Sequence, residues 1–234
     1  MRMKRHVIPL SVLATLAALR GVLLSGFIPP FHGPDEQAHF DYVQLLAEQR
    51  RMPTLATACS GYSPESRALW DTVVTPIVFH PERPLPPLAT FIGSAHPTAA
   101  ERWTTGCGPD AIYPPLYFAS ATPGYLLREE APLIQRIFAT RLASVVWGIA
   151  TVVFAYLAAL WWTGRVHDGL LLGLITLLQP MIGFLSGVVT NDSALFACAT
   201  GAFAAISLLR RSGATPHALA LLATCCVAGC LTKP

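Results

Sequence analysis

The most informative stretch of the chain is Pro34-Asp35-Glu36-Gln37-Ala38-His39-Phe40-Asp41-Tyr42. It follows the first long apolar segment, residues 7–31, at the point where the chain is expected to leave a membrane. Two adjacent carboxylates close to a histidine are costly to place beside hydrocarbon, because charged groups are strongly destabilised there. They are well suited to a wet region at the membrane edge. The sequence therefore predicts that apolar segments hold this acidic turn at the bilayer surface.

Composition favours a membrane protein. The 234 residues are 53% hydrophobic and 12% charged, whereas an ordinary soluble domain is about 25% charged. The apolar residues come in long blocks, which is typical of several membrane-spanning helices. The formal net charge of +3 is small and dispersed. We therefore predict no nucleic-acid partner, because a protein that binds nucleic acid carries a basic stripe.

The predicted fold is an all-α multi-pass membrane protein with about five transmembrane helices in one domain, residues 1–234. The first helix is expected over residues 6–30. The basic residues before it are also typical of the beginning of a signal peptide. The apolar run of this helix continues past Arg20 and is long enough to span a membrane. Arg20 either snorkels outward, the more ordinary interpretation, or faces the interior of the bundle. Residues 136–234 are expected to supply the four further helices, at 141–163, 169–188, 193–209 and 217–232.

Loop charges predict the orientation of these helices. The basic N-terminus and the short basic connections at residues 164–168 and 210–213 are expected on the cytoplasmic side. Residues 31–135 then form one large extracytoplasmic loop, whose many prolines favour short interfacial helices joined by irregular chain. Cys59 and Cys107 lie in this loop and are candidates for a disulfide. The expected location is the inner (plasma) membrane, with the N-terminus in the cytoplasm.

This topology brings scattered polar residues to the outer surface. They are Asp35, Glu36, His39, Arg136, Arg141, Asn191, Asp192 and Lys233. In a functional interpretation, a carboxylate of the acidic turn takes a proton from an incoming nucleophile. The cationic side chains can bind a phosphate group, for which guanidinium groups are well suited.

The acidic turn also has a structural interpretation. Pro34 suits the first position of a helix, and acidic residues in a first turn are favoured by the helix dipole. The stretch then begins a helix that runs to about Arg51. His39 and Tyr42 lie on one face of this helix, and Asp35 lies one turn before His39 on the same face. A metal bound by Asp35 and His39 would have too few ligands to be assigned.

The other candidates have structural interpretations as well. Asn191 and Asp192 precede an apolar run, as helix N-cap residues do. Arg136 and Arg141 can snorkel at the interface, and Lys233 can anchor the end of a helix. Both interpretations of each residue stay open from the sequence alone.

The order of these parts resembles the GT-C superfamily of integral-membrane glycosyltransferases. The motifs that carry the resemblance are Pro34-Asp35-Glu36 with His39 and Tyr42, Tyr113-Pro114-Pro115-Leu116-Tyr117, Gln179-Pro180 and Asn191-Asp192-Ser193. Within that superfamily the chain looks most like the bacterial membrane family called domain of unknown function 2142, which is similar to the protein O-mannosyltransferases. Because GT-C enzymes generally have more than five spans, the resemblance implies that this chain is an N-terminal fragment.

The resemblance implies inverting transfer of a sugar from a polyprenyl-phosphate donor to a cell-envelope acceptor, at the outer face of the membrane. Asp35 would be the base that deprotonates the acceptor hydroxyl, and Glu36 is the second candidate for that role. His39, Tyr42, Asn191 and Asp192 would contact substrate. Arg136, Arg141 and Lys233 would stabilise the departing lipid phosphate. The expected partners are this donor and membrane lipid, and no cofactor is assigned, although a divalent metal and the identity of the acceptor stay open.

The alternative is a non-enzymatic multi-pass membrane protein, either a transporter or a scaffold for envelope assembly. Transporters tend to place polar groups near the midplane of the membrane and to contain repeated halves. Here the polar residues gather at the predicted outer edge instead. Arg20 is the feature that favours a transport path.

Overall fold

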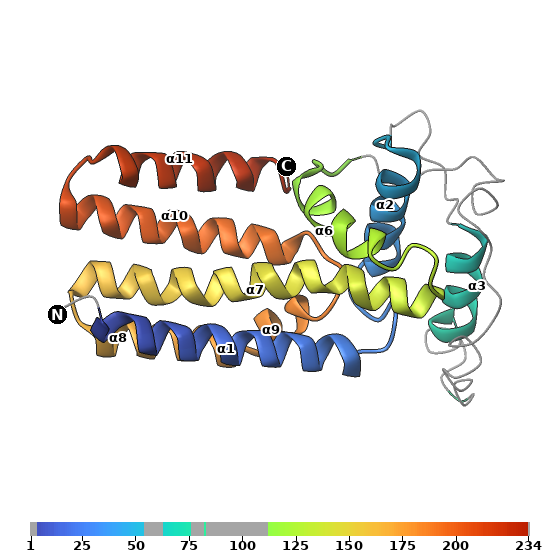
Figure 1. Cartoon of the computed structure of the whole chain (residues 1–234), viewed down its shortest axis with the longest axis horizontal. Coiled ribbons are helices and arrows are strands. Elements are labelled where there is room, and N and C mark those ends of the chain that lie inside the picture. The colour runs from blue at the N-terminus through green and yellow to red at the C-terminus, as the bar shows by residue number, and fades with distance from the viewer. Residues whose placement is uncertain (1–3, 54–62, 76–81, 83–111, 234) are drawn as a thin grey trace. The chain divides into compact units, whose positions relative to one another are not determined.

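The computed structural model describes residues 4–53, 63–75, 82 and 112–233. Within these ranges the chain forms nine α-helices and no strand (Figure 1), which confirms the all-α fold class. The chain divides into two compact units. Unit 1 comprises Met1–Leu24, Ser144–Gly187 and Asn191–Pro234, and unit 2 comprises Ser25–Ala143 and Val188–Thr190.

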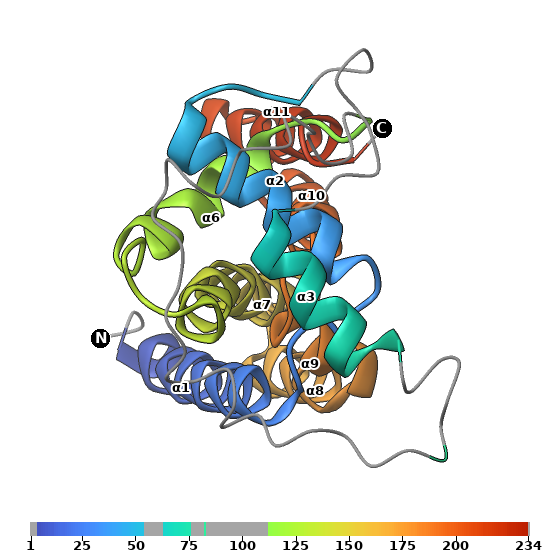
Figure 2. The same cartoon turned by 90° about the vertical axis from the view of Figure 1, so that its right-hand side faces the viewer.

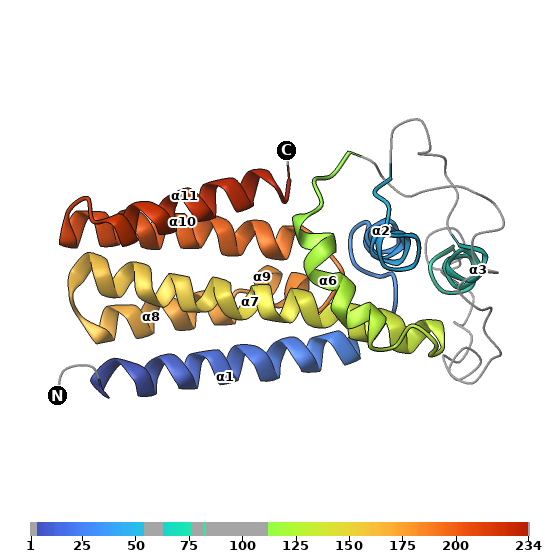
Figure 3. The same cartoon turned by 45° about the horizontal axis from the view of Figure 1, so that its top comes forward.

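Unit 1 is built from apolar helices of different lengths. They are α1 (Lys4–Phe27) and α7 (Leu133–Thr163), each of which also extends into unit 2, together with α8 (Val166–Leu178), α9 (Pro180–Ser186), α10 (Asp192–Ser212) and α11 (Pro216–Cys230). α10 and α11 lie side by side, and the unit 1 parts of α1 and α7 have roughly parallel axes, with the chain running in opposite senses along them (Figures 1 and 3). Leu13, Val152, Tyr156 and Leu177 form a core between α1, α7 and α8. The apolar blocks of the sequence therefore become a helical bundle.

Three of these helices are long and apolar enough to cross a membrane, namely Val7–Phe27, Leu133–Thr163 and Asp192–Ser212. α8 and α9 make a fourth if the pair counts as one broken span. α11 is a shorter apolar helix of 15 residues. The predicted number of five spans is therefore not confirmed, although the helices fit a membrane protein.

The predicted span at residues 169–188 is not one straight helix. α8 ends at Leu178, α9 begins at Pro180, and the two are bent by 66°. Proline lacks the backbone N–H that a continuous helix needs, and its ring clashes with the preceding turn. The predicted span therefore corresponds to a broken helix pair, which Pro180 interrupts.

Unit 2 contains α2 (Glu36–Gln49), α3 (Pro64–Val73), α6 (Leu116–Leu126) and the start of α7. α3 lies beside α2 (Figure 2), and both are seen almost end-on in Figure 3. The helix predicted to begin at the acidic turn is confirmed as α2, which ends two residues before the predicted boundary. Eleven of its 14 residues are buried, including five with charged or amide side chains or an imidazole. α2 is therefore the central helix of this unit.

The predicted large loop, residues 31–135, contains α2, α3 and α6. Its extracytoplasmic position stays a prediction. Cys59 and Cys107, the pair suggested for a disulfide, lie outside the described residues.

Candidate functional site

Asp35 lies at the N-terminus of α2 in a strained turn. Its backbone is left-handed, with φ 52° and ψ 17°, and its side chain makes no capping hydrogen bond to the helix. Phe31, four residues earlier, also has a positive φ of 63° and is buried. Left-handed backbone is unusual for residues other than glycine, and Asp tolerates it better than most. The turn therefore presents an exposed carboxylate from a backbone that the surrounding structure holds in place.

Glu36, the next residue, is engaged differently. Its carboxylate is fully buried and pairs with Arg141, whose Nε and Nη2 donate to its two oxygens at 2.7 and 2.8 Å. Gly33 N and Val189 N donate to the same carboxylate at 3.3 and 2.9 Å. Four donors leave little capacity for Glu36 to accept a proton from a substrate. The structure gives Glu36 the role of an anchor for the turn.

The hydrogen-bond donors of the Arg141 side chain are also fully used. Besides Glu36, its guanidinium donates to the backbone carbonyl oxygens of Ser25, Ile28 and Pro29 at 2.6–2.9 Å. An arginine has five N–H groups, and these contacts account for all five. Arg141 thus ties the segment between α1 and α2 to α7.

The three residues Val188–Thr190 are bound within unit 2 through their backbone. Val189 N donates to Glu36, and His39 Nδ1 lies 3.2 Å from the Val189 carbonyl oxygen. Because a carbonyl oxygen only accepts, the Nδ1 of His39 carries the hydrogen in this bond. Thr190 N donates to the hydroxyl of Tyr117 at 3.0 Å. The acidic turn and α6 therefore hold the chain segment that precedes Asn191.

His39 and Tyr42 belong to an aromatic cluster. Tyr42 stacks on Phe118 with ring centroids 3.9 Å apart, and the His39 ring meets Tyr113 edge-on at 5.5 Å. Both residues are almost completely buried. Burial raises the pKa of the Tyr42 phenol. The predicted shared face of His39 and Tyr42 is confirmed, and it packs against α6 and the residues just before it.

Arg136 is also paired inside unit 2. Its Nη2 contacts both carboxylate oxygens of Glu65, at 2.5 and 2.6 Å, and its Nη1 donates to Tyr125. The Tyr125 hydroxyl in turn bonds Glu48. The snorkelling interpretation is wrong for Arg136 and Arg141, since both side chains are fully buried.

α2 also carries a polar stripe that was not predicted from the sequence, formed by Gln37, Asp41, Gln44 and Glu48. Their spacing of four, three and four places them on one helix face, where they meet α3 and Arg136. Asp41 is fully buried, and burial raises its pKa well above the usual range. The helical spacing of these four residues could be recognised in the sequence. Their burial against α3 and Arg136 could not, because a single sequence does not show which elements pack together.

In unit 1, two bonds join the N-terminus of α10 to the end of α11. Asn191 Nδ2 donates to the Thr232 carbonyl oxygen at 3.2 Å, and Lys233 Nζ lies 2.6 Å from Asp192 Oδ1. Asn191 occupies the predicted N-cap position but makes no side-chain capping bond. The side chains of Lys233 and Asp192 are 36% and 31% exposed, so this pair is open to solvent in part.

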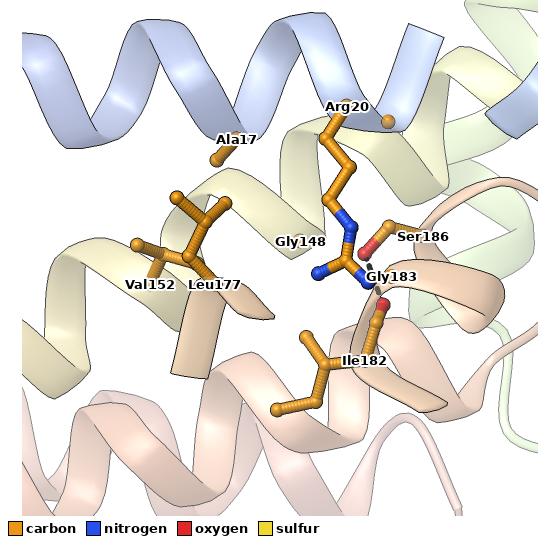
Figure 4. Close-up of a pocket in the computed structure, with 9 residues that line it drawn as sticks. Ala17, Arg20, Gly148, Val152, Leu177, Ile182, Gly183 and Ser186 are labelled. Atoms are coloured by element: carbon orange, nitrogen blue, oxygen red, sulfur yellow. Dashed lines mark hydrogen bonds between the residues drawn. The ribbon is translucent and has the colours of Figure 1, made fainter. Parts of the chain in front are cut away.

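Arg20 in unit 1 reaches the break between α8 and α9. Figure 4 shows its side chain pointing from α1 toward Gly183 and Ser186. Nη2 donates to the Gln179 carbonyl oxygen at 3.3 Å. A cavity of about 10 Å³, lined also by Gly148, lies beside the Arg20 side chain. This volume is about the space that one water molecule needs. Arg20 is half-buried and reaches toward α9, which agrees with the interpretation that it faces the interior of the bundle.

The predicted site residues thus fall into two sets. Unit 2 contains Asp35, Glu36, His39, Tyr42, Arg136 and Arg141, and unit 1 contains Asn191, Asp192 and Lys233. That all nine serve one pocket stays a prediction. Among the described residues no group of three or more His, Cys, Asp or Glu side chains is arranged to hold a metal ion.

Comparison with known proteins gives one family. The model of a family described as predicted membrane protein (DUF2142) matches residues 18–234, which is well over half of the chain. No curated protein and no solved structure matches the chain.

Proposed function

The chain belongs to the DUF2142 family of predicted membrane proteins, and from this premise we propose that it is a glycosyltransferase of the GT-C type. It uses a polyprenyl-phosphate sugar as donor at the outer face of the cytoplasmic membrane, with the N-terminus in the cytoplasm. The acceptor is a hydroxyl group of the cell envelope. The observation that carries the proposal is Asp35, an exposed carboxylate fixed in left-handed backbone at the head of a buried helix.

In the proposed reaction, Asp35 takes the proton of the acceptor hydroxyl as its oxygen attacks the anomeric carbon of the sugar. The attack comes from the face opposite the phosphate, so the configuration inverts. The bond between the anomeric carbon and the phosphate oxygen breaks, and the lipid phosphate leaves with the electron pair. Asp35 ends the step protonated.

Glu36 and Arg141 act as positioning residues in this proposal. Their buried contacts fix Gly33 and the carbonyl groups before it, which sets the backbone from which Asp35 projects. Arg136 stabilises the same unit through Glu65. Both arginines are buried and paired with glutamates, so neither is proposed as a ligand for the donor phosphate.

The test compares variants of Asp35 for consumption of a polyprenyl-phosphate sugar in membranes. Asp35→Asn and Asp35→Gly both tolerate left-handed backbone and remove the base. Both are expected to reach the membrane normally and to lose at least about 100-fold in turnover, since general-base catalysis contributes about 10²–10⁴.

The matched control is Arg50→Gly, at the other left-handed position of α2, φ 51°. It changes the backbone preference without removing an acid and is expected to retain activity. Normal turnover in both Asp35 variants would overturn the assignment of the base.

A transporter is the second candidate, and one observation favours it. Arg20 binds the carbonyl group of Gln179 where α8 and α9 are bent apart, and broken helices line the substrate sites of many transporters. The test measures solute flux into proteoliposomes. Flux that is lost in Arg20→Gln and kept in Asp35→Asn would support transport and contradict the proposed glycosyltransferase function.

A further inference from the structure

α3 docks on α2 through a polar surface. Gln37 Nε2 donates to the Ser66 carbonyl oxygen at 3.3 Å, and Ser63 Oγ donates to Gln44 Oε1 at 3.3 Å. Gln44 Nε2 also reaches Glu65 at 3.4 Å. Two apolar residues of α3, Leu69 and Val73, are also buried. These hydrogen bonds between α2 and α3 are therefore all long, at 3.3–3.4 Å.

The Asp41 carboxyl and the Ser66 hydroxyl lie near each other in this interface but not in hydrogen-bonding geometry. Both residues are fully buried, and within the described part of the chain neither oxygen of Asp41, nor the hydroxyl of Ser66, has a hydrogen-bond partner. A buried carboxylate without donors is strongly destabilised, at a cost of several kcal/mol. A protonated carboxyl is neutral and can donate to a nearby hydroxyl or amide oxygen. The docked arrangement thus suits the protonated form of Asp41.

The charged groups around Asp41 act in the same direction overall. Glu65 from α3 and Glu48 from α2 disfavour a further negative charge, whereas Arg136 from α7 and the Ser66 hydroxyl favour it. Arg136 is already paired with Glu65 and bonded to Tyr125. Burial is the largest influence, and together these groups raise the pKa of Asp41 well above its usual range.

We propose that α3 is a proton-dependent latch, which stays docked on α2 while Asp41 is protonated and releases when Asp41 ionises. Release gives the Asp41 carboxylate access to water and removes the penalty of burying it. It also uncovers Gln37 and Gln44, both now buried beneath α3. The proposal concerns α2 and α3 within unit 2 and is independent of the proposed function.

The direction of the pH dependence follows from linkage. An undocked Asp has a pKa of about 3.9, and in the docked state the pKa of Asp41 is raised. Between these two values the docked state binds more protons, so docking is favoured at low pH. Docking weakens by up to about tenfold for each unit of pH rise in that interval, and levels off above it.

The experiment measures amide hydrogen exchange of the full chain in lipid nanodiscs from pH 4.5 to 8.5. Protection of peptides covering residues 64–73, corrected for intrinsic exchange rates, is expected to fall by up to about tenfold per pH unit over part of this range. Peptides from α10 serve as an internal reference and are expected to show no such trend.

Variants assign the effect to Asp41. Asp41→Asn and Asp41→Leu carry no ionisable group and are expected to give flat profiles. Asp71→Asn is the matched control, since Asp71 is an acid of α3 whose side chain is 51% exposed and paired with Arg67. It is expected to keep the native profile.

A flat profile in the native chain overturns the proposal, whether or not the variants fold. An unchanged slope in Asp41→Asn or Asp41→Leu, or loss of the slope in Asp71→Asn, overturns it as well.

Discussion

Single residues set the geometry of α2 at both of its ends. Asp35 and Arg50 have positive φ values of 52° and 51°, and α2 lies between them. At its head, Glu36 and Arg141 form a fully buried pair surrounded by backbone groups. The position of the candidate base therefore depends on a few strained or buried residues.

Replacement of Arg50 by glycine is expected to stabilise the protein. A left-handed backbone conformation destabilises the folded state by about 1–2 kcal/mol for a residue with a side chain, and glycine removes this cost. Glycine in turn lowers the free energy of unfolding by about 0.4–1 kcal/mol, because it gives the unfolded chain more conformational freedom. The net gain of about 0.5–1 kcal/mol should appear as a higher thermal midpoint in detergent. A lower midpoint for Arg50→Gly would contradict this account.

Loss of the buried carboxylate is expected to be costly. Glu36→Gln leaves Arg141 without its counter-charge, and breaking a buried pair costs about 3–5 kcal/mol. The control is Arg67→Gln, which breaks the pair with Asp71 whose side chains are 57% and 51% exposed, and which should change stability by less than about 1 kcal/mol. Equal denaturant midpoints for the two variants would show that the Glu36 pair is not the anchor described here.

At the scale of the helices, two glycines mark close approaches. A side chain at Gly124 of α6 would meet the backbone oxygen of Ala139 in α7. A side chain at Gly183 of α9 would meet the guanidinium of Arg20, the far end of a flexible side chain. The backbone oxygen of Ala139 cannot move aside, whereas the guanidinium of Arg20 can.

Alanine at these two glycines is therefore expected to give different results. Gly124→Ala should cost about 1–3 kcal/mol, as overpacking usually does, and no single neighbouring substitution should restore stability. The cost of Gly183→Ala should largely disappear when Arg20 is replaced by Ala. A double-mutant cycle on thermal stability measures this coupling, and additive effects would contradict the contact.

Helices that begin or end at local features could be predicted from the sequence, and contacts between distant residues could not. Pro34 and the acids after it indicated α2 correctly, because first-turn preferences are local. The bend at Pro180 was also local and could have been predicted. The partners of Arg141 and Arg136 could not be, because Glu36 and Glu65 lie 105 and 71 residues away and a single sequence does not show such pairs.

For the whole molecule, the chain passes between its two units four times, at residues 24–25, 143–144, 187–188 and 190–191. Two of these passages fall inside the continuous helices α1 and α7. The candidate membrane spans and the loop charges together predict which ends of the helices face the cytoplasm.

The orientation is tested with single cysteines at two exposed positions. Pro34→Cys is expected to react with a membrane-impermeant maleimide in intact cells, and Ser212→Cys only after permeabilisation. Both positions are exposed in their units, and the chain without an added cysteine serves as the control for its six native cysteines. Labelling of residue 212 but not residue 34 in intact cells would reverse the topology.

The long-range partners of Glu36 also bear on how the chain is made. Arg141 and Val189, which surround this carboxylate in the finished fold, lie 105 and 153 residues further along. At translation rates of about 5–20 residues per second, the ribosome needs roughly 5–20 s to deliver the arginine after the glutamate. During that interval the nascent acidic turn must stay hydrated or be shielded by the insertion machinery, so biogenesis factors have a defined window in which to recognise an unfinished chain.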